Sequence, residues 1–154
     1  MIYHLNIGSN LGDKFNNLEM AIALIEQRLL CGVQESSYLL TEPWGFESDN
    51  SFLNVAVKVD SNLSPLEMLS VLQGIEQKMS TESHRNEDGS YKNRIIDIDI
   101  IAVDGMIIDT PELTVPHPLM HLREFVLKPM CELDPQWKHP ILEKTVEELL
   151  DGLK

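Results

Sequence analysis

Residues 94–101 read Arg-Ile-Ile-Asp-Ile-Asp-Ile-Ile and place two carboxylates, Asp97 and Asp99, inside a run of isoleucines. As a strand, this segment would carry both aspartates on one face, about 6.6 Å apart along the chain. Carboxylates in apolar surroundings are costly unless a cation compensates them, and hard cations that carry substrate phosphates suit that role. The spacing therefore favours a metal site for phosphoryl chemistry, with two ions clamping the transferred group. The alternative is a pair of ordinary acids on a solvent-exposed face.

Two further side chains could contact phosphate. Arg94 immediately precedes the strand, and its guanidinium fork suits phosphate oxygens. Strict alternation puts Arg94 on the face opposite the aspartates. The alternative to a phosphate contact is that Arg94 forms a surface salt bridge. His117 lies between Pro116 and Pro118, which fix its backbone. Taken alone, His117 is either a functional group or a structural hydrogen-bond donor.

An aromatic ring and an amide share one face of a strand predicted over residues 52–59. Phe52 and Asn54 alternate there with apolar residues that face the other way. Stacking and hydrogen bonding by such a pair would suit a flat heterocycle, and the alternative is a ring packed under a loop. The Gly-Ser-Asn turn at residues 8–10 could also bind phosphate, but it is not a Walker motif and is a weak signal by itself.

Capping signals predict three helices. Asp13 can cap the first helix, which Gly32 is expected to end. Residues 64–67, Ser-Pro-Leu-Glu, form a capping box with proline at the first helical position and open a second helix. A second box, Thr-Val-Glu-Glu at residues 145–148, opens a last helix.

The strands and loops complete the predicted order. Four segments have the composition of strands: residues 2–7, 33–38, 52–59 and 95–103. Residues 80–93 are predicted to form a long polar loop and residues 112–120 an extended, proline-rich segment, while residues 123–133 are short and mixed. The order strand, helix, strand, strand, helix, strand predicts a ferredoxin-like βαββαβ sandwich of the α+β class with a C-terminal extension.

Composition bounds the class of protein. The chain has 154 residues, of which 43% are hydrophobic, and this length favours a single domain over residues 1–154 with its own core. Its formal net charge of −13 should repel nucleic acid and anionic membranes, so neither is an expected partner. The chain lacks a signal-peptide pattern and an apolar run of the ~20 residues that a membrane helix needs, which favours a cytoplasmic location. Its two cysteines do not suggest a disulfide framework.

Five short motifs follow one another along the chain. They read Gly-Ser-Asn-Leu-Gly-Asp at 8–13, Phe-Leu-Asn-Val-Ala-Val at 52–57, Arg-Ile-Ile-Asp-Ile-Asp at 94–99, Leu-Thr-Val-Pro-His-Pro at 113–118, and Arg-Glu-Phe-Val-Leu at 123–127 with Pro129 behind it. Each motif is weak by itself, but the ordered set is highly specific and spans nearly the whole chain. Together the motifs resemble the 6-hydroxymethyl-7,8-dihydropterin pyrophosphokinase family of folate biosynthesis.

The resemblance implies an enzyme that transfers pyrophosphate from ATP to the hydroxymethyl oxygen of the pterin and releases AMP. It implies two Mg²⁺ ions held by Asp97 and Asp99, with Arg94 as a further catalytic residue and ATP as co-substrate. The expected partners are therefore the small molecules ATP and 6-hydroxymethyl-7,8-dihydropterin, and the expected oligomeric state is a monomer.

The matching positions also imply the binding residues. ATP would contact Gln73, Arg94, Thr114 and His117, and Arg123 would contact phosphate or the pterin side. Asn54 would hydrogen-bond the pterin between the rings of Phe52 and Phe125. The backbone of the loop from Thr41 through Pro43 and Trp44 to Gly45 would edge the pterin.

Residues 80–93 depart from the family pattern. Many members carry Gly-Arg where this chain has Ser80-Thr81, and Trp-Gly-Pro where it has Tyr91-Lys92-Asn93. We expect Arg85 and Lys92 to supply the charge that contacts ATP there.

Two other classes of protein remain open from the residues. One is a non-catalytic ligand-binding domain on the same fold, and the other is an interaction module whose acidic surface binds a basic protein. Magnesium-dependent ATP binding separates both from the enzyme.

Overall fold

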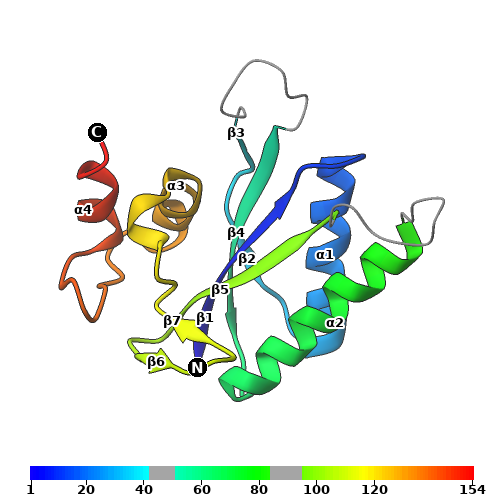
Figure 1. The fold of residues 1–154 in the computed structure, drawn as a ribbon, viewed down its shortest axis with the longest axis horizontal. Coiled ribbons are helices and arrows are strands. Elements are labelled where there is room, and N and C mark those ends of the chain that lie inside the picture. The colour runs from blue at the N-terminus through cyan, green and yellow to red at the C-terminus, as the bar shows by residue number, and fades with distance from the viewer. Residues whose placement is uncertain (42–50, 84–94) are drawn as a thin grey trace.

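The computed structural model describes residues 1–41, 51–83 and 95–154, and for residues 81–83 the backbone alone. It is a mixed structure of helices and an antiparallel sheet (Figure 1). The elements are β1 Ile2–Ser9, α1 Lys14–Leu29, β2 Gln34–Glu35, β3 Leu39–Thr41, β4 Phe52–Asp60, α2 Pro65–Ser83, β5 Asp97–Val103, β6 Ile108–Asp109, β7 Thr114–Val115, the 3₁₀ turn η1 Met120–Leu122, α3 Glu124–Leu133 and α4 Val146–Asp151.

The main sheet is built around β1. Its strands lie in the order β2-β4-β1-β5, and β3 also pairs with β4. Every pairing is antiparallel, and β1 is hydrogen-bonded along most of its length to β4 on one side and to β5 on the other. A short hairpin of β6 and β7 forms a second sheet.

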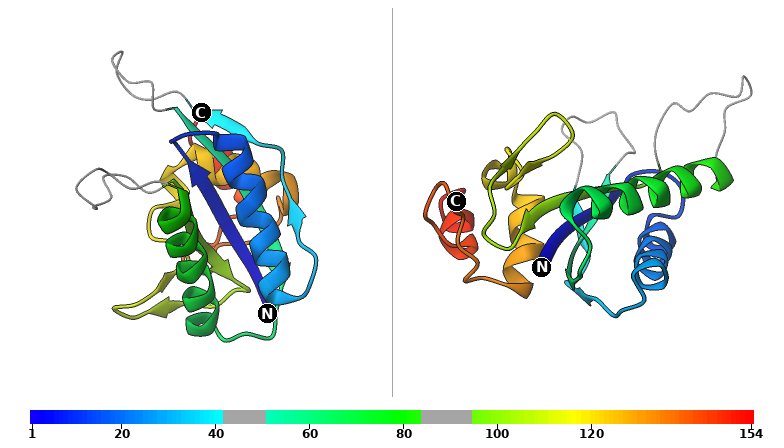
Figure 2. Two further views of the ribbon diagram at one scale, coloured as in Figure 1. Left: turned by 90° about the vertical axis from the view of Figure 1, so that its right-hand side faces the viewer. Right: turned by 90° about the horizontal axis from the view of Figure 1, so that it is seen from below.

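Helices α1 and α2 cover one face of the main sheet, which we call the α1/α2 face (Figures 1 and 2). The alternating apolar residues of the strands point toward these helices and form a continuous core. This core includes Leu5, Ile7, Val55, Val57, Ile98 and Ile100 from the strands, and Leu18, Ile25, Leu72 and Ile75 from the helices.

Helices α3 and α4 lie on the opposite face, which we call the α3/α4 face (Figures 1 and 2). A second, smaller apolar cluster packs there. It includes Ala56, Ile101, Ala102, Met120, Leu127, Met130 and Val146. The polar residues Asn6, Gly8, Asn54, Asp97 and Asp99 belong to the same face by strand alternation and pairing register.

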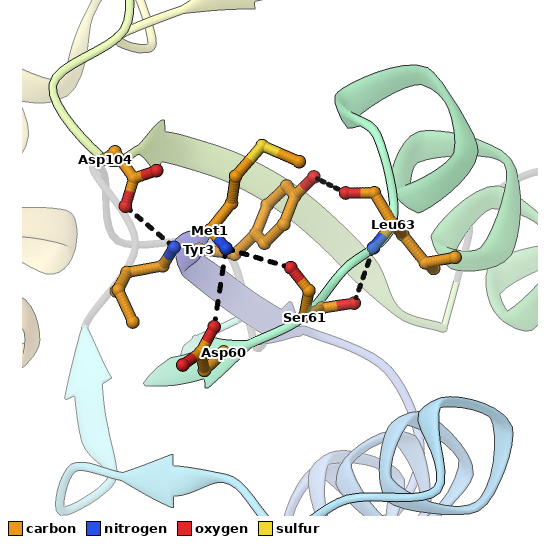
Figure 3. A network of polar contacts seen from close by, with 7 residues as sticks. Met1, Tyr3, Asp60, Ser61, Leu63 and Asp104 are labelled. Carbon is orange, nitrogen blue, oxygen red and sulfur yellow. Dashed lines mark hydrogen bonds and ion pairs between the residues drawn. The ribbon is translucent and has the colours of Figure 1, made fainter.

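The N-terminal end of β1 is held by polar contacts (Figure 3). The amide of Ile2 donates to Asp104 Oδ1 at 2.8 Å, and the hydroxyl of Tyr3 donates to the carbonyl of Leu63. The terminal ammonium of Met1 donates to the carbonyl of Ser61 at 3.0 Å. These bonds fix the end of the sheet that lies farthest from Gly8 and Ser9.

The predicted helix starts are confirmed. Asp13 Oδ1 accepts from the amide of Asn16 at 3.1 Å and caps α1. Ser64 and Glu67 exchange the two hydrogen bonds of a capping box at the start of α2, at 2.9 and 3.2 Å. The box at residues 145–148 likewise opens α4.

Two predicted element ends are wrong. Helix α1 ends at Leu29 rather than near Gly32, because Leu30 takes the left-handed conformation, with φ 55°, and turns the chain two residues earlier. The side chain of Leu30 is 90% exposed, so no packing opposes that turn. Helix α2 continues to Ser83, so the predicted loop over 80–93 begins later than expected.

The strand predicted over residues 33–38 is also wrong in its extent. It pairs with β4 at Gln34 and Glu35 alone. Ser36 then bonds Ala56 twice, through its own backbone amide at 3.0 Å and through Oγ, which accepts the amide of Ala56 at 2.8 Å. This side-chain bond replaces a ladder bond, and the chain resumes pairing only in β3.

Several elements were not predicted, among them β3 and η1, and one strand begins later than expected. The hairpin of β6 and β7 lies partly in the segment predicted as an extended loop, and α3 occupies residues that had no assignment. Pro129 lies inside α3 and cannot donate a helical hydrogen bond. Strand β5 begins at Asp97 rather than at Ile95.

Candidate active site

The predicted site residues gather where β1 ends and where β4 and β5 begin. Gly8 pairs with Asn54 on β4 and with Asp97 on β5. One step back, Asn6 pairs with Ala56 and Asp99. These two rows cross three neighbouring strands on the α3/α4 face. The amide of the predicted pterin site and the predicted metal carboxylates therefore lie on the two strands that flank β1.

Both aspartates are exposed on the same face, as their spacing predicts. Asp97 and Asp99 are exposed, whereas Ile98 between them is 5% exposed and belongs to the core of the α1/α2 face. The isoleucine run therefore does not bury the carboxylates, because Ile96, Ile98 and Ile100 pack on the α1/α2 face. Both side chains are accessible to solvent, so the expectation that they need a cation because their surroundings are apolar does not apply to them.

Glu76 is a residue of this region that the sequence argument missed. Its Oε2 accepts from the backbone amide of Ile98 at 2.8 Å. That amide lies between the two aspartates on the outer edge of β5, so the bond ties the edge strand to α2. In sequence, Glu76 is an ordinary helical glutamate, and its contact becomes visible only when α2 is packed on the sheet.

Gly8 is required where it stands because β1 passes close to Asn54. A Cβ added at Gly8 would lie 2.7 Å from Asn54 Oδ1, which is closer than real Cβ contacts allow. Asn54 itself is 3% exposed. The missing side chain at position 8 thus leaves room for the amide that is predicted to bind the pterin.

His117 follows β7 and is held by two backbone contacts. Its amide donates to the carbonyl of Ile101 at 2.8 Å, and its Nδ1 accepts from the amide of Leu119 at 3.1 Å. An accepting Nδ1 leaves the proton of the neutral ring on Nε2. Burial lowers the pKa of His117, with Asp99 raising it and Arg123 lowering it further. The ring is therefore a neutral Nε2–H donor near neutral pH, close enough to Asp99 and Arg123 to sense both charges.

The start of α3 presents Phe125, one of the two predicted stacking rings. The Arg123 guanidinium carbon lies 5.5 Å from the centroid of the Phe125 ring, within the range of a cation–π contact. Phe125 is half-buried against the apolar cluster of the α3/α4 face. Phe52 opens β4, is 39% exposed and pairs with Thr41 on β3. Phe52 shares the face of Asn54, as its alternation predicts.

Two of the predicted ATP contacts border a cavity of about 300 Å³ beside the β6–β7 hairpin. Thr114 and His117 line it, together with His121, His139 and Ile141 among others. Gln73 lies elsewhere, exposed on α2 three residues before Glu76. Residues three apart share a helix surface, so Gln73 is on the side of α2 that approaches the edge of β5.

The remaining predicted site residues lie outside the described part of the chain. They are Pro43, Trp44, Gly45, Arg85, Lys92 and Arg94. Within the described residues, no group of three or more His, Cys, Asp or Glu side chains could hold a metal ion by itself. Across the same residues, no helix is long and apolar enough to cross a membrane.

Comparisons with known proteins agree with the motifs. The family model for 7,8-dihydro-6-hydroxymethylpterin-pyrophosphokinase (HPPK) matches residues 4–135. A 2-amino-4-hydroxy-6-hydroxymethyldihydropteridine pyrophosphokinase of Porphyromonas gingivalis is 39% identical over 140 residues, which are 90% of this chain and 94% of the relative. The protein of the same name from Bacillus subtilis is 37% identical over 133 residues, 86% of this chain and 77% of that one.

Longer relatives contain a similar segment. The folic acid synthesis protein FOL1 of Dictyostelium discoideum is 39% identical over 150 residues, which cover 96% of this chain and 22% of that protein. The crystal structure of Plasmodium falciparum HPPK-DHPS with pteroate superposes with a TM-score of 0.77 at 17% identity, covering 98% of this chain and 42% of that one. This chain thus spans about a fifth of the Dictyostelium protein and less than half of the Plasmodium chain, and the structural likeness shows a shared fold.

Proposed function

Because the chain belongs to the 7,8-dihydro-6-hydroxymethylpterin-pyrophosphokinase family, we propose that it transfers a pyrophosphoryl group from ATP to 6-hydroxymethyl-7,8-dihydropterin in folate synthesis. The hydroxymethyl oxygen bonds to the β-phosphorus of ATP and loses its proton to solvent, the bond from that phosphorus to the α,β-bridging oxygen breaks, and AMP leaves. The products are the pterin diphosphate and AMP.

The observation that carries this proposal is the pairing of Asp97 and Asp99 with the polar positions of β1. Both carboxylates are exposed on one face, and their rows continue through Gly8 to Asn54. Mg²⁺ is commonly bound by one or two carboxylates together with substrate phosphates, so this donor set fits it. Two Mg²⁺ ions bound here would neutralise charge that develops on the phosphates.

The protein's own part is positioning, which is the main requirement in phosphoryl-type transfer. Asn54 hydrogen-bonds the pterin, and Phe52 and Phe125 stack on its two faces. The backbone of the loop from Thr41 to Gly45 contacts the pterin edge. These contacts aim the hydroxymethyl oxygen at the β-phosphorus held beside Asp97 and Asp99.

The ATP side has its own set of residues. His117 donates from Nε2 to a phosphate oxygen, and Arg94 and Arg123 supply positive charge. Arg85 and Lys92 add charge from the segment that departs from the family pattern. Thr114 is a further ATP contact, and Gln73 is a weaker candidate for one.

The same proposal extends to the architecture. The sheet order β2-β4-β1-β5 with two helices on one face supports the ferredoxin-like arrangement, followed by α3 and α4 as a C-terminal extension. Residues 1–154 act as one pyrophosphokinase domain, and we expect it to work as a monomer.

The proposed reaction is tested by identifying its products and by asking whether they form only when the pterin is present. Purified protein is incubated with β-³²P-labelled ATP, Mg²⁺ and 6-hydroxymethyl-7,8-dihydropterin, and the products are separated by chromatography. AMP and labelled pterin diphosphate should form together, and neither should form without the pterin. Release of ADP, or label left in inorganic phosphate, would contradict pyrophosphoryl transfer.

A further inference from the structure

We infer that Asn6 is a positioning residue that fixes the first turn of α3, and with it the ring of Phe125, against the row of the sheet that contains Asp99. The inference rests on the proposed role of Phe125 in stacking on the pterin. It adds a residue that lies on β1, outside the motifs that identify the family.

The starting observation is a carbonyl that lacks its helical donor. In an α-helix, the carbonyl of residue 125 accepts from the amide of residue 129. Here that residue is Pro129, which lies inside α3 and has no N–H. The carbonyl of Phe125 therefore needs a donor from outside the helix, since an unpaired carbonyl inside a protein costs free energy.

Asn6 supplies that donor. Its Nδ2 lies 3.1 Å from the carbonyl oxygen of Phe125 and donates to it across 119 residues of chain. The side chain of Asn6 is 4% exposed and sits on a strand whose other buried neighbours, Leu5 and Ile7, are apolar. A buried amide at such a position is costly unless it is bonded, so the contact explains why an asparagine is tolerated there.

The register of β1 gives this contact its functional meaning. Asn6 pairs directly with Asp99 on β5 and lies two residues before Gly8, which pairs with Asp97 and Asn54. One side chain therefore connects the strand row of the proposed metal ligands to the helix turn that carries the proposed stacking ring. A shift of that turn would move the pterin relative to the phosphates, and small misplacements of this kind are costly in transfer reactions.

The test compares Asn6→Leu in two backgrounds. In the wild-type background, loss of the donor should raise the KM for the pterin about fivefold, the factor expected for one hydrogen bond, while the KM for ATP stays within twofold. In the Pro129→Ala background, the helix regains its own N–H for the Phe125 carbonyl, so the same substitution should change the pterin KM by less than twofold. Asn6→Ala removes the donor without adding volume and should behave in the same way.

A matched control removes a comparable bond at the far end of β1. Tyr3→Phe deletes the hydroxyl that donates to the carbonyl of Leu63 (Figure 3) and should leave both KM values unchanged. Hydrogen exchange provides a readout that does not need activity: the amides of Val126, Leu127, Lys128 and Met130 should exchange faster in Asn6→Leu and return toward the wild-type rate in the double variant.

The possible failures are distinguishable. Wild-type protein that forms no AMP with the pterin would overturn the proposed function. Hydrogen exchange would still test whether the Asn6 bond to the Phe125 carbonyl fixes the first turn of α3. Active wild-type protein with an unchanged pterin KM in Asn6→Leu would overturn the positioning role. An equal effect of Asn6→Leu in both backgrounds would show that the missing proline N–H is not the reason for the contact.

Discussion

The two faces of the main sheet differ in what they bury. The α1/α2 face presents an unbroken set of apolar side chains to two helices, and its core residues are almost fully buried. The α3/α4 face is apolar where α3 and α4 pack, but carries Gly8, Asn54, Asp97 and Asp99 at its other end, which we call the open end because both aspartates are exposed there. Strands β1, β4 and β5 contribute to both faces, so residues next to one another in the sequence point to opposite faces of the sheet.

This difference separates stability from chemistry by strand alternation. Residues of one parity pack against α1 and α2. Residues of the other parity pack against α3 and α4 or, at the end that carries Asp97 and Asp99, are proposed to face the substrates. A substitution on the α1/α2 face should therefore cost folding free energy with little effect on turnover of the folded protein. A substitution at the open end of the α3/α4 face should do the reverse.

The sharpest comparison is Asp97→Ala against Ile7→Ala. Loss of the proposed metal ligand Asp97 should lower kcat/KM by about 10³-fold, by analogy with the removal of a group that stabilises transition-state charge. The free energy of unfolding should stay within about 0.5 kcal/mol of the wild-type value, as is usual for surface changes. Ile7 is fully buried on the α1/α2 face, and its truncation should cost about 2–5 kcal/mol of unfolding free energy. Urea unfolding and steady-state kinetics measure both quantities on each variant.

The comparison would break if the two variants behaved alike. A large loss of stability in Asp97→Ala would indicate a structural role for that carboxylate. A loss of turnover in folded Ile7→Ala as large as that in Asp97→Ala would show that the faces do not divide the two duties.

Gly8→Ala tests the close approach within the α3/α4 face. The new methyl group would meet Asn54 Oδ1 at 2.7 Å and displace the amide, so the KM for the pterin should rise about tenfold, equivalent to about 1.4 kcal/mol. Gly105→Ala is a matched control, because a Cβ at Gly105 meets nothing within 4 Å. Equal kinetics for the two variants would remove Asn54 from the pterin site.

Phe125→Ala tests the stacking ring and should have a smaller effect. The affinity for the pterin should fall about fivefold, in line with roughly 1 kcal/mol for an aromatic pair, while ATP binding measured by calorimetry stays the same. Phe15→Ala removes an exposed ring from α1, on the other face, and should change neither affinity. Equal weakening of ATP and pterin binding by Phe125→Ala would contradict the assignment.

The smallest expected effect is the dependence of stability on histidine protonation. The main histidine is His4, which lies on the α3/α4 face. His4 is 3% exposed, and its Nε2 lies 3.0 Å from Asp134 Oδ2, which also contacts Lys58. Burial lowers the pKa of His4 and outweighs the raising effect of Asp134. The unfolded chain, with a histidine pKa near 6.5, then binds the proton first as the pH falls.

Stability should therefore be full above about pH 6.5 and should decline as the pH falls below it. His117 and His139, whose pKa values are also lowered, act in the same direction. Urea unfolding between pH 7.5 and 5.5 measures the slope, and His4→Gln should reduce it without abolishing it. A slope that His4→Gln leaves unchanged would show that the proton is taken up elsewhere.

The sequence was most informative where a local rule decides the structure. Strand alternation placed Asp97 and Asp99 on one face, and capping boxes located the starts of α2 and α4. It failed where tertiary contacts overrule local signals. Residues 123–133 had no assignment, yet they contain α3 with Pro129 inside it, and Asn6 donates to the carbonyl of Phe125 that the proline leaves without a helical donor.

The same distinction applies to the site. Resemblance to the family supplied the residues, but the closeness of Gly8 to Asn54 and the bond from Ile98 to Glu76 depend on strand pairing and helix packing. Neither contact has a signal at the level of spacing along the chain. The contacts of the segments at 42–50 and 84–94 stay predictions.

The most direct measurement is the number of metal ions that the site holds. Mn²⁺ binding is followed by electron paramagnetic resonance with α,β-methylene-ATP and 6-hydroxymethyl-7,8-dihydropterin present, for the wild type and for Asp97→Asn. The account predicts two tightly bound Mn²⁺ ions per wild-type chain and at least one fewer in Asp97→Asn, with the fold unchanged. Equal Mn²⁺ binding by both proteins would contradict the central claim that Asp97 and Asp99 hold the metal at which the pyrophosphoryl group is transferred.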